Sequence, residues 1–230
     1  MKIIALIPAR KGSKGILNKN MQMLNGMPLV EHTIKAAFMA DNIDEIWVSS
    51  DDPNILAIGK NYNLNIIKRP KNISSDSASA VDVVNHFLSL LPNIEDKSNT
   101  IIGYLQPTSP LRTEVHIDEL ISKMKKESIS SSLSVVKLEK SPFKSFVIEK
   151  RSGKLKSLFN EKYSNFRRQD LPDVYIPNGA MYFFSILDFV KRGGFPSNGS
   201  MPYVMSKEDS IDIDWESDIK KVVKVLEDRK

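Results

Sequence analysis

A cluster of cations follows the first apolar stretch of the chain. Residues 8–20 read PARKGSKGILNKN and contain four basic side chains and no acidic one. The first 30 residues carry five of the 33 Lys and Arg and none of the 28 Asp and Glu, so the surplus of positive charge is local. A surplus confined to one loop indicates a site for a small polyanion such as a phosphate group, rather than an extended nucleic-acid surface.

The two glycines of this loop favour the same chemistry. Gly12 and Gly15 let backbone N–H groups approach phosphate oxygens closely, while Arg10, Lys14 and Lys19 supply charge. The spacing is neither that of a dinucleotide-binding G-x-G-x-x-G turn nor that of a P-loop. The alternative is a solvated basic loop that binds nothing.

A second polar loop, QPTSPLR, occupies residues 106–112. Its two prolines fix φ and keep a helix from starting before Thr113. The loop would present four polar side chains at the edge of a sheet, namely Gln106, Thr108, Ser109 and Arg112. The alternative is a connection whose hydroxyl groups only cap the next helix.

Two carboxylates stand near the end of the chain, in the sequence SIDIDWE. Asp212 and Asp214 are two residues apart, so on a strand both side chains would face the same way. At a separation of roughly 6–7 Å they would repel by on the order of 2–3 kcal/mol unless a cation lay between them. Mg²⁺ shared with phosphate oxygens would relieve that repulsion. The alternative is that Asp214 caps a helix starting at about Trp215.

Short β-rich runs alternate with longer helical segments along the chain. The expected strands are Ile3–Ile7, Ile46–Ser50, Leu64–Ile67, Ile101–Leu105 and Leu133–Val136. The expected helices are Leu29–Ala40, Ile55–Tyr62, Ala80–Leu91 and Val115–Lys126. This alternation predicts an α/β fold with a parallel sheet covered by helices. The loops after Ile7, Ser50 and Leu105 should then share the ligand-binding edge of the sheet.

The pattern changes between about residues 138 and 177. Two β-like runs flank a Ser-Gly turn in SFVIEKRSGKLKSLF, and a polar stretch follows them. This segment is expected to form an inserted lobe. The βα character resumes with NGAMYFFSI, and the last helix shows one apolar face made by Ile219, Val222, Val223 and Leu226.

Composition excludes several classes of protein. The 230 residues contain no Cys, which removes disulfides, Cys-based zinc sites, iron–sulfur clusters and thiol nucleophiles. The first apolar run is too short for a signal peptide, and no run approaches a membrane span. The basic loop lacks the interleaved aromatics that stacking on single strands requires. We therefore expect a cytoplasmic protein that acts on neither nucleic acid nor membranes.

Four motifs occur in one order along the chain: IPARKGSKGILNKN, LQPTSPLR, RRQ with PNGAMYF downstream, and DSIDID. Together they resemble the CMP-sialic acid synthetases, or acylneuraminate cytidylyltransferases, including members that activate related sugars such as legionaminic acid. The resemblance covers nearly the whole chain. It implies a Rossmann-like, GT-A-like nucleotidyltransferase fold with a mostly parallel sheet. It also implies a single domain over residues 1–230, with a dimerisation and sugar-specificity lobe inserted at about 138–177.

The resemblance implies a reaction in which CTP and a nine-carbon sialic-type acid give a CMP-sugar and pyrophosphate, in a homodimer serving surface glycan synthesis. Mg²⁺, or Mn²⁺ in its place, would be held by Asp212 and Asp214. The residues implied to be catalytic are Arg10, Lys19, Gln106, Asp212 and Asp214. Those implied to bind the nucleotide are Ala9, Arg10, Gly12, Ser13, Lys14, Lys19, Asn20, Ser77, Ser79 and Asn178. Those implied to contact the sugar are Gln106, Thr108, Ser109, Arg168 and Gln169, with Arg168 reaching a neighbouring subunit's site.

Two rival functions remain at this stage. One is a cytidylyltransferase for 3-deoxy-manno-octulosonate, the eight-carbon analogue, whose related opening motif usually reads STRLP. The sequence Ser13-Lys14-Gly15 disfavours it. The other is a nucleotide-binding module without turnover. The sequence does not identify a general base, although Asp212 is one candidate.

Overall fold

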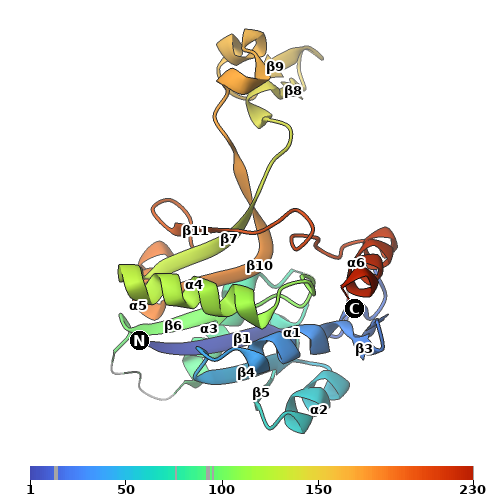
Figure 1. The fold of residues 1–230 in the computed structure, drawn as a ribbon, viewed down its shortest axis with the longest axis vertical. Coiled ribbons are helices and arrows are strands. Elements are labelled where there is room, and N and C mark those ends of the chain that lie inside the picture. Colours follow the sequence, from blue (N-terminus) through green and yellow to red (C-terminus); the bar gives the residue numbers. More distant parts are fainter. Residues whose placement is uncertain (13–14, 76, 92–93, 95, 230) are drawn as a thin grey trace.

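The computed structural model describes residues 1–12, 15–75, 77–91, 94 and 96–229, and its centre is a seven-stranded sheet (Figure 1). The strand order is β11-β7-β10-β6-β1-β4-β5. Within it, β10 runs antiparallel to both of its neighbours, while the other neighbouring pairs are parallel. The strands are β1 (Lys2–Pro8), β4 (Glu45–Ser50), β5 (Asn65–Lys68), β6 (Thr100–Tyr104), β7 (Ser131–Lys137), β10 (Tyr175–Ser185) and β11 (Met201–Val204).

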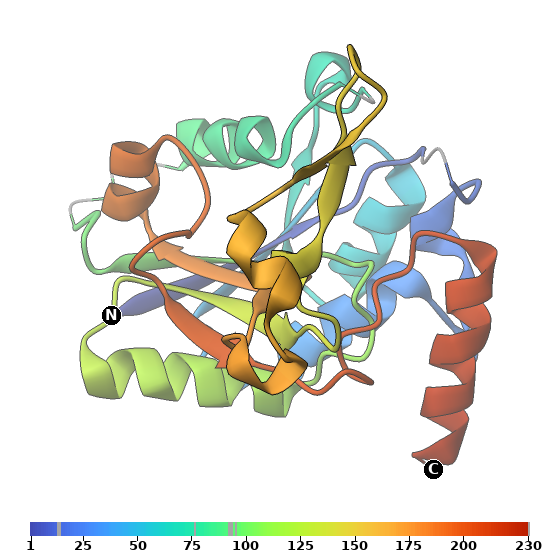
Figure 2. The ribbon, with the colours of Figure 1, turned by 90° about the horizontal axis from the view of Figure 1, so that it is seen from above.

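Helices cover both faces of this sheet (Figures 1 and 2). One face carries α1 (Leu29–Met39), α2 (Pro53–Asn61) and α4 (Glu114–Glu127). The opposite face carries α3 (Ala80–Leu90) and α5 (Ile186–Arg192). The predicted α/β fold with a mostly parallel sheet is confirmed, and each predicted strand and helix is present with its ends within two residues of the expected positions.

Strand β1 shows why the alternation of the sequence produces three layers. Its residues are apolar on both faces because both faces are covered by helices. Ile3, Ala5 and Ile7 pack among α1, α2 and α4, whereas Ile4 and Leu6 pack among α3 and α5. The two-residue repeat of a strand therefore fills two separate hydrophobic clusters.

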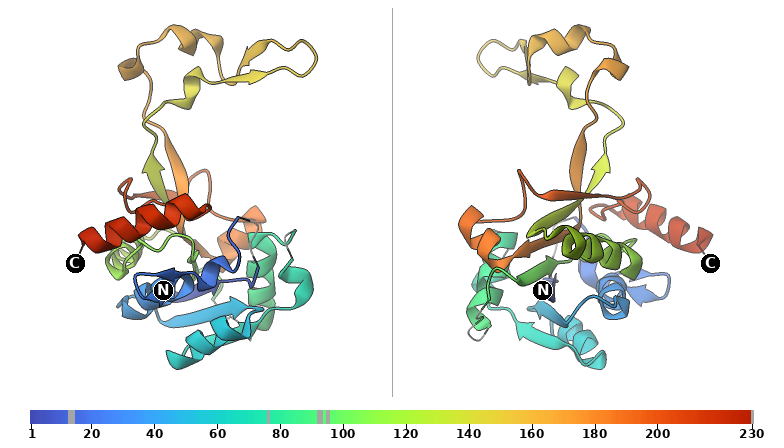
Figure 3. Two further views of the ribbon diagram at one scale, coloured as in Figure 1. Left: turned by 90° about the vertical axis from the view of Figure 1, so that its right-hand side faces the viewer. Right: turned by 60° about the vertical axis from the view of Figure 1, so that its left-hand side comes forward.

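The last helix, α6 (Glu216–Asp228), lies apart from these layers (Figure 3). Its predicted apolar face is confirmed, because Val222 is fully buried and Ile219, Val223 and Leu226 pack around it. The partner surface includes Ile16, from the basic loop, and the small hairpin of β2 (Met23–Leu24) and β3 (Met27–Pro28). Helix α6 thus holds the segment 211–215 beside the basic loop. No helix in the described ranges has the length and apolar character of a membrane span.

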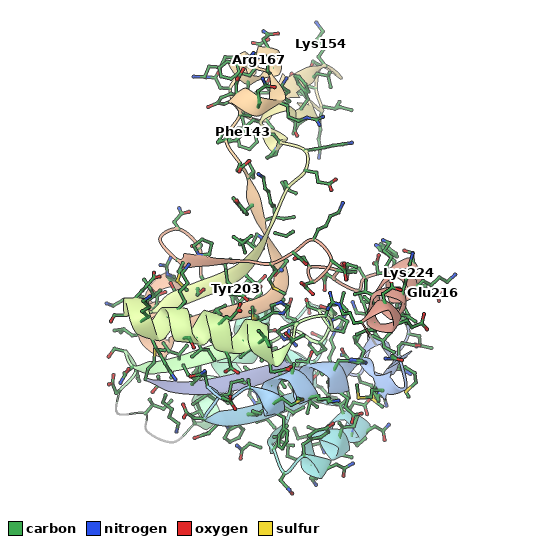
Figure 4. The ribbon with its side chains drawn as sticks, in the orientation of Figure 1. Phe143, Lys154, Arg167, Tyr203, Glu216 and Lys224 are labelled. Carbon is green, nitrogen blue, oxygen red and sulfur yellow. The ribbon has the colours of Figure 1, made fainter. Side chains whose placement is uncertain are left out.

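Residues 138–174 leave the sheet between β7 and β10 and form a lobe at the end of a narrow two-stranded stalk (Figure 3). The lobe contains a hairpin of β8 (Phe146–Ile148) and β9 (Leu155–Ser157) and short 3-10 turns. Lys154 and Arg167 lie at its far end, away from the sheet, and Phe143 lies nearer to the stalk (Figure 4). None of the three large hydrophobic clusters includes a described residue of the lobe.

The stalk geometry predicts that the sheet folds without the lobe. Lys137 and Tyr175 are paired, and the amide of Leu138 donates to the carbonyl of Val174 at 2.8 Å. Replacing residues 139–173 with an Asn-Gly turn should therefore close β7 and β10 into a tight hairpin. We expect the midpoint of thermal unfolding to fall by no more than about 4 °C, roughly 1 kcal/mol for a chain of this size. Loss of cooperative unfolding in this variant would show that the lobe is part of the core.

Candidate active site

A cavity of about 490 Å³ opens at the carboxyl ends of β1, β5 and β6. Its volume lies in the range of pockets that hold small organic ligands. The expected convergence at this edge is observed for the loops after β1 and β6, and the segment before α6 joins them. The loop after β4 instead supports the basic loop, because Asp51 Oδ1 accepts from the amide of Lys11 at 2.8 Å. The residues lining the cavity include Pro8, Arg10, Gly12, Gly15, Lys19, Asn20, Arg69, Ser79, Tyr104, Gln106, Thr108, Asp214 and Trp215.

Lys19 connects the basic loop to the acidic segment. Its Nζ donates to the carbonyl oxygen of Ile213 at 2.7 Å and to Asp214 Oδ1 at 3.2 Å. The Lys19 side chain is only 13% exposed, whereas that of Asp214 is 65% exposed. The loop is held on its other side by Asn20, whose Nδ2 donates to the carbonyl of Arg10 at 2.9 Å. These bonds fix a cation and a carboxylate side by side on the cavity wall.

Gly15 allows the two segments to touch. A Cβ built on Gly15 would lie 2.5 Å from the carbonyl oxygen of Asp214, so any larger residue would force the loop away. Ala9 is buried behind the loop, and Gly12 lines the cavity with nothing within 4 Å of a built Cβ. Ser13 and Lys14, both predicted to bind the nucleotide, lie outside the described residues.

The loop after β6 forms the opposite wall. Gln106 and Thr108 line the cavity, and the carbonyl of Thr108 accepts from the amide of Ile213 at 2.8 Å. Ser109 is fully buried, and its Oγ has no hydrogen-bond partner in the described chain. Gly179 of β10 adopts φ +79°, and a Cβ there would approach Gln106 Oε1 at 3.0 Å. Glycine adopts this positive φ readily, and the absence of a side chain at Gly179 leaves room for the Gln106 amide.

Asp212 lies deeper than Asp214. Burial raises the pKa of the Asp212 carboxyl, while a hydrogen bond from Thr108 opposes this shift and the charge of Asp214 adds to it. Its Oδ1 is buried and has no hydrogen-bond partner in the described chain. A partly buried carboxylate with an unpartnered oxygen, next to a second carboxylate, is a suitable pair of ligands for a hard divalent cation. The described residues contain no cluster of three His, Cys, Asp or Glu side chains placed to hold a metal by themselves.

Two possibilities considered for this acidic segment are not observed. Residues 212–214 do not form a strand, because no neighbouring strand offers them a ladder of hydrogen bonds. Nor does Asp214 cap α6. That role belongs to Asp218, whose Oδ2 accepts from the amides of Trp215 at 3.0 Å and Asp214 at 3.3 Å. The Asp214 carboxylate is therefore left free to face the cavity and Lys19.

Arg69 and Tyr104 also line the cavity, although no sequence motif marked them. Arg69 directly follows β5 and is buried, with Nη2 donating to the carbonyl of Ser49 at 2.6 Å and Nε to the Ser49 hydroxyl at 3.2 Å. Burial lowers the pKa of Arg69. Tyr104 ends β6, and burial raises the pKa of its hydroxyl to about 12. Their positions at the carboxyl ends of two predicted strands were the available signal.

Other predicted nucleotide residues have mixed positions. Ser79 lines the cavity and caps α3, with its hydroxyl accepting from the amide of Asp82 at 3.1 Å. Ser77 is exposed and contacts the hydroxyl of Ser75 at 3.0 Å. Asn178 does not line the cavity. It is buried, and its amide is occupied by hydrogen bonds within the protein.

Arg168 and Gln169 lie in the lobe, outside the cavity of their own chain. Arg168 instead lines a groove at the base of the lobe together with Leu171, Lys137 and Lys207. Both predicted sugar contacts are exposed. Within one chain the structure therefore separates them from Gln106.

Comparisons with known proteins show which family the sequence is similar to. Residues 4–184 match the cytidylyltransferase family. The N-acylneuraminate cytidylyltransferase of Escherichia coli O18:K1:H7 is 32% identical over 225 residues, which cover 97% of this chain and 52% of the relative. N-acylneuraminate cytidylyltransferase B of Danio rerio is 32% identical over 216 residues, which cover 93% of this chain and 49% of the relative. The chain thus spans about half the length of the curated relatives that it matches.

Solved structures share the fold at low sequence identity. A CMP:2-keto-3-deoxy-manno-octonic acid synthetase complexed with CTP superposes with a TM-score of 0.69 at 16% identity, over 100% of both chains. The 4-diphosphocytidyl-2C-methyl-D-erythritol synthase from Anaerococcus prevotii gives a TM-score of 0.64 at 15% identity, covering 98% of this chain and 96% of that one. These likenesses establish the fold.

The contact at Gly15 leads to a prediction about stability. Gly15→Ala should lower the free energy of unfolding by about 1–3 kcal/mol, because the new methyl group overlaps the Asp214 carbonyl and separates the two segments. Gly12→Ala is the matched control, since nothing lies within 4 Å of its built Cβ. Urea unfolding of both variants measures the difference. Equal stabilities would mean that the loop does not pack against Asp214.

Proposed function

Because the chain belongs to the cytidylyltransferase family, we propose that it transfers the cytidylyl group of CTP to a nine-carbon sialic-type acid, such as N-acetylneuraminate or a legionaminate-type sugar. The products would be a CMP-sugar and pyrophosphate. The observation that carries the proposal is the cavity in which the basic loop meets the Asp212–Asp214 segment. The names of the relatives from Escherichia coli and Danio rerio support the choice of acceptor.

The cations of the cavity would bind the triphosphate. Arg10 and Lys19 are placed on the basic loop, and Arg69 supports the floor of the same cavity. Backbone amides near Gly12 can approach phosphate oxygens, because no side chain blocks that position. Asn20 keeps the loop in shape through the carbonyl of Arg10. Charge on the departing pyrophosphate would be stabilised by Arg10 and Lys19.

The acceptor would lie against the loop after β6. The anomeric hydroxyl of the sugar would lose its proton to a base and attack the α-phosphorus in line, so that the new P–O bond forms as the bond to pyrophosphate breaks. Gln106 borders both the main cavity and an adjoining hollow lined by Tyr182 and Phe195, so it is placed to orient the sugar. Thr108 shares this wall. Positioning of the two reactants supplies much of the rate in such transfers.

The two aspartates fit a divalent cation. Asp212 and Asp214 would hold Mg²⁺, or Mn²⁺ in its place, because Asp212 has a buried unpartnered oxygen and Asp214 faces the cavity. The ion, when bound, would neutralise phosphate charge. Lys19 already contacts Asp214, so the chain itself balances part of the carboxylate charge beside the phosphates.

The lobe has the surface of a subunit interface. Seven large apolar side chains between residues 146 and 166 are exposed, namely Phe146, Val147, Ile148, Leu155, Leu158, Phe159 and Phe166. Many exposed apolar side chains on one small lobe are typical of an interaction site. We place the contact between two copies of the chain, with Arg168 of each directed to the sugar site of its neighbour. A reaction that consumes CTP fits a cytoplasmic enzyme supplying activated sugar for surface glycans.

The test of the proposed function is release of pyrophosphate from CTP in the presence of a panel of acids. We expect release with nine-carbon sialic-type acids and Mg²⁺, and much less with ATP or GTP. The eight-carbon 3-deoxy-manno-octulosonate forms a separate arm. Turnover restricted to that sugar would replace the proposed acceptor, and CTP binding without turnover for any acid would make the protein a binding module.

Substitution of the aspartates separates a cation-binding role from a structural one. Asp212→Asn and Asp214→Asn should each lower kcat by roughly 10²–10³, about 3–4 kcal/mol, because a ligand charge is lost where phosphate charge develops. Asp218→Asn is the control, since Asp218 caps α6 and does not line the cavity. It should cost up to ~1 kcal/mol of stability and leave turnover unchanged. Near-wild-type kcat in both test variants would disprove the metal assignment.

Mixing two inactive variants tests whether Arg168 acts across the dimer. Arg168→Ala and Asp214→Asn should each be nearly inactive alone. In random heterodimers one site would combine an intact Asp214 with the partner's intact Arg168, so the mixture should regain about a quarter of wild-type activity by symmetry. Light scattering at micromolar concentration checks the dimer. A monomer with full activity, or no recovery on mixing, would refute the arrangement.

A further inference from the structure

Among the described residues, Arg112 is the largest fully buried side chain, and it does not line the cavity. Its guanidinium donates to neutral groups. Nη1 donates to the carbonyls of Ala180 at 2.7 Å and Gln106 at 3.1 Å, and Nη2 donates to the hydroxyl of Thr33 at 2.5 Å. Nε finds no partner in the described chain.

This arrangement is costly for a structural role alone. Within the described ranges no carboxylate forms an ion pair with Arg112, so its charge is buried without direct compensation. Burying a charge without a partner disfavours folding, and apolar residues of similar volume often fill such space at lower cost. What a planar guanidinium offers instead is several donors in a fixed geometry. Arg112 uses them to hold backbone carbonyls.

The carbonyls that it holds belong to two walls of the site. Gln106 is the first residue of the loop after β6 to carry a polar side chain into the cavity. Ala180 follows Gly179, in the stretch of β10 where the register with β7 shifts between Pro177 and Tyr182. The Gln106 amide lies against Gly179, with Oε1 at 3.0 Å from a built Cβ. Arg112 thus holds the backbone on both sides of the contact between Gln106 and Gly179.

The third partner anchors the group to a rigid element. Thr33 is fully buried in α1, and its hydroxyl also lies 3.5 Å from the Gln106 carbonyl. Helix α1 packs in the main hydrophobic cluster with β1 and α4. Hydrogen bonds through Arg112 and Thr33 therefore fix the position of Gln106 relative to the core of the domain. None of these bonds involves the basic loop that would hold the triphosphate.

We propose that Arg112 is a positioning residue for the acceptor sugar, acting through Gln106 and the backbone of Gly179 and Ala180 in β10 rather than by contact with substrate. The inference rests on the proposed function. Arg112 and Thr33 form a buried frame, and this frame supports the part of the cavity where the acceptor would bind. It separates two parts of the site. The basic loop and Arg69 set nucleotide binding, whereas the frame of Arg112 and Thr33 sets the orientation of the acceptor.

The test compares kinetic constants for the two substrates. Arg112→Lys keeps the charge but loses the fork of donors, so kcat/KM for the sugar should fall by about tenfold to hundredfold, as expected when a positioning group is displaced. The KM for CTP should stay within about twofold. Thr33→Val should show the same selective loss to a smaller degree, and Thr33→Ser, which keeps the hydroxyl, should restore it.

A double-mutant cycle shows whether Arg112 acts through Gln106. In a Gln106→Ala background, Arg112→Lys should lower kcat/KM for the sugar by less than about threefold, because the group that it positions is already gone. Full additivity, or parallel changes in both KM values together with lost stability, would overturn the proposal. Hydrogen exchange supplies a readout apart from turnover, and faster exchange at residues 105–109 and 179–181 in Arg112→Lys is expected. Unchanged exchange at these residues would contradict the positioning role of Arg112 even if the wild-type protein proved inactive on every acid.

Discussion

The contact between Lys19 and the segment before α6 is the interaction on which the site depends. Its ammonium group binds the Ile213 carbonyl at 2.7 Å and the Asp214 carboxylate at 3.2 Å, and so joins parts of the chain that are 194 and 195 residues apart. Gly15 permits the close approach. Charges of both signs are thereby held on one wall, which suits a triphosphate accompanied by a cation. Without this contact the cavity would lose one side.

The fold explains why the remaining side of the cavity can be rigid. Parallel strands β1 and β6 end together at one edge, and antiparallel β10 brings Gly179 back to that edge from the lobe. The buried guanidinium of Arg112 then fixes the backbone between β6 and β10. The two walls of the cavity therefore have different supports, namely the hydrogen bonds of Lys19 and Asn20 on the basic-loop side and those of Arg112 on the other. The lobe stands outside both, which is consistent with a contribution to a neighbouring copy.

Much of the fold and part of the site could be predicted because the signals are local. Apolar runs such as Ile3–Ile7 are buried on both faces, and the prolines of QPTSPLR delay α4 until Glu114, so periodicity and turn chemistry suffice there. Other features depend on tertiary contacts. Asn178 satisfies its amide inside the core through Ser134 and Ser210, which are distant in sequence. The cap of α6 is local instead, because Asp218 accepts from the amide of Trp215 three residues before it. Arg69 carried no motif, only a position at the end of a strand.

In the proposed function the basic loop and the two aspartates bind one ligand together, the triphosphate of CTP with its divalent cation. Calorimetric titration with CTP at increasing Mg²⁺ concentration tests this most directly. The wild-type protein is compared with a double variant that carries both Asp212→Asn and Asp214→Asn. Affinity for CTP should rise with Mg²⁺ in the wild type and depend much less on Mg²⁺ in the variant. Binding of CTP that is equally tight with and without Mg²⁺ in both proteins would contradict it.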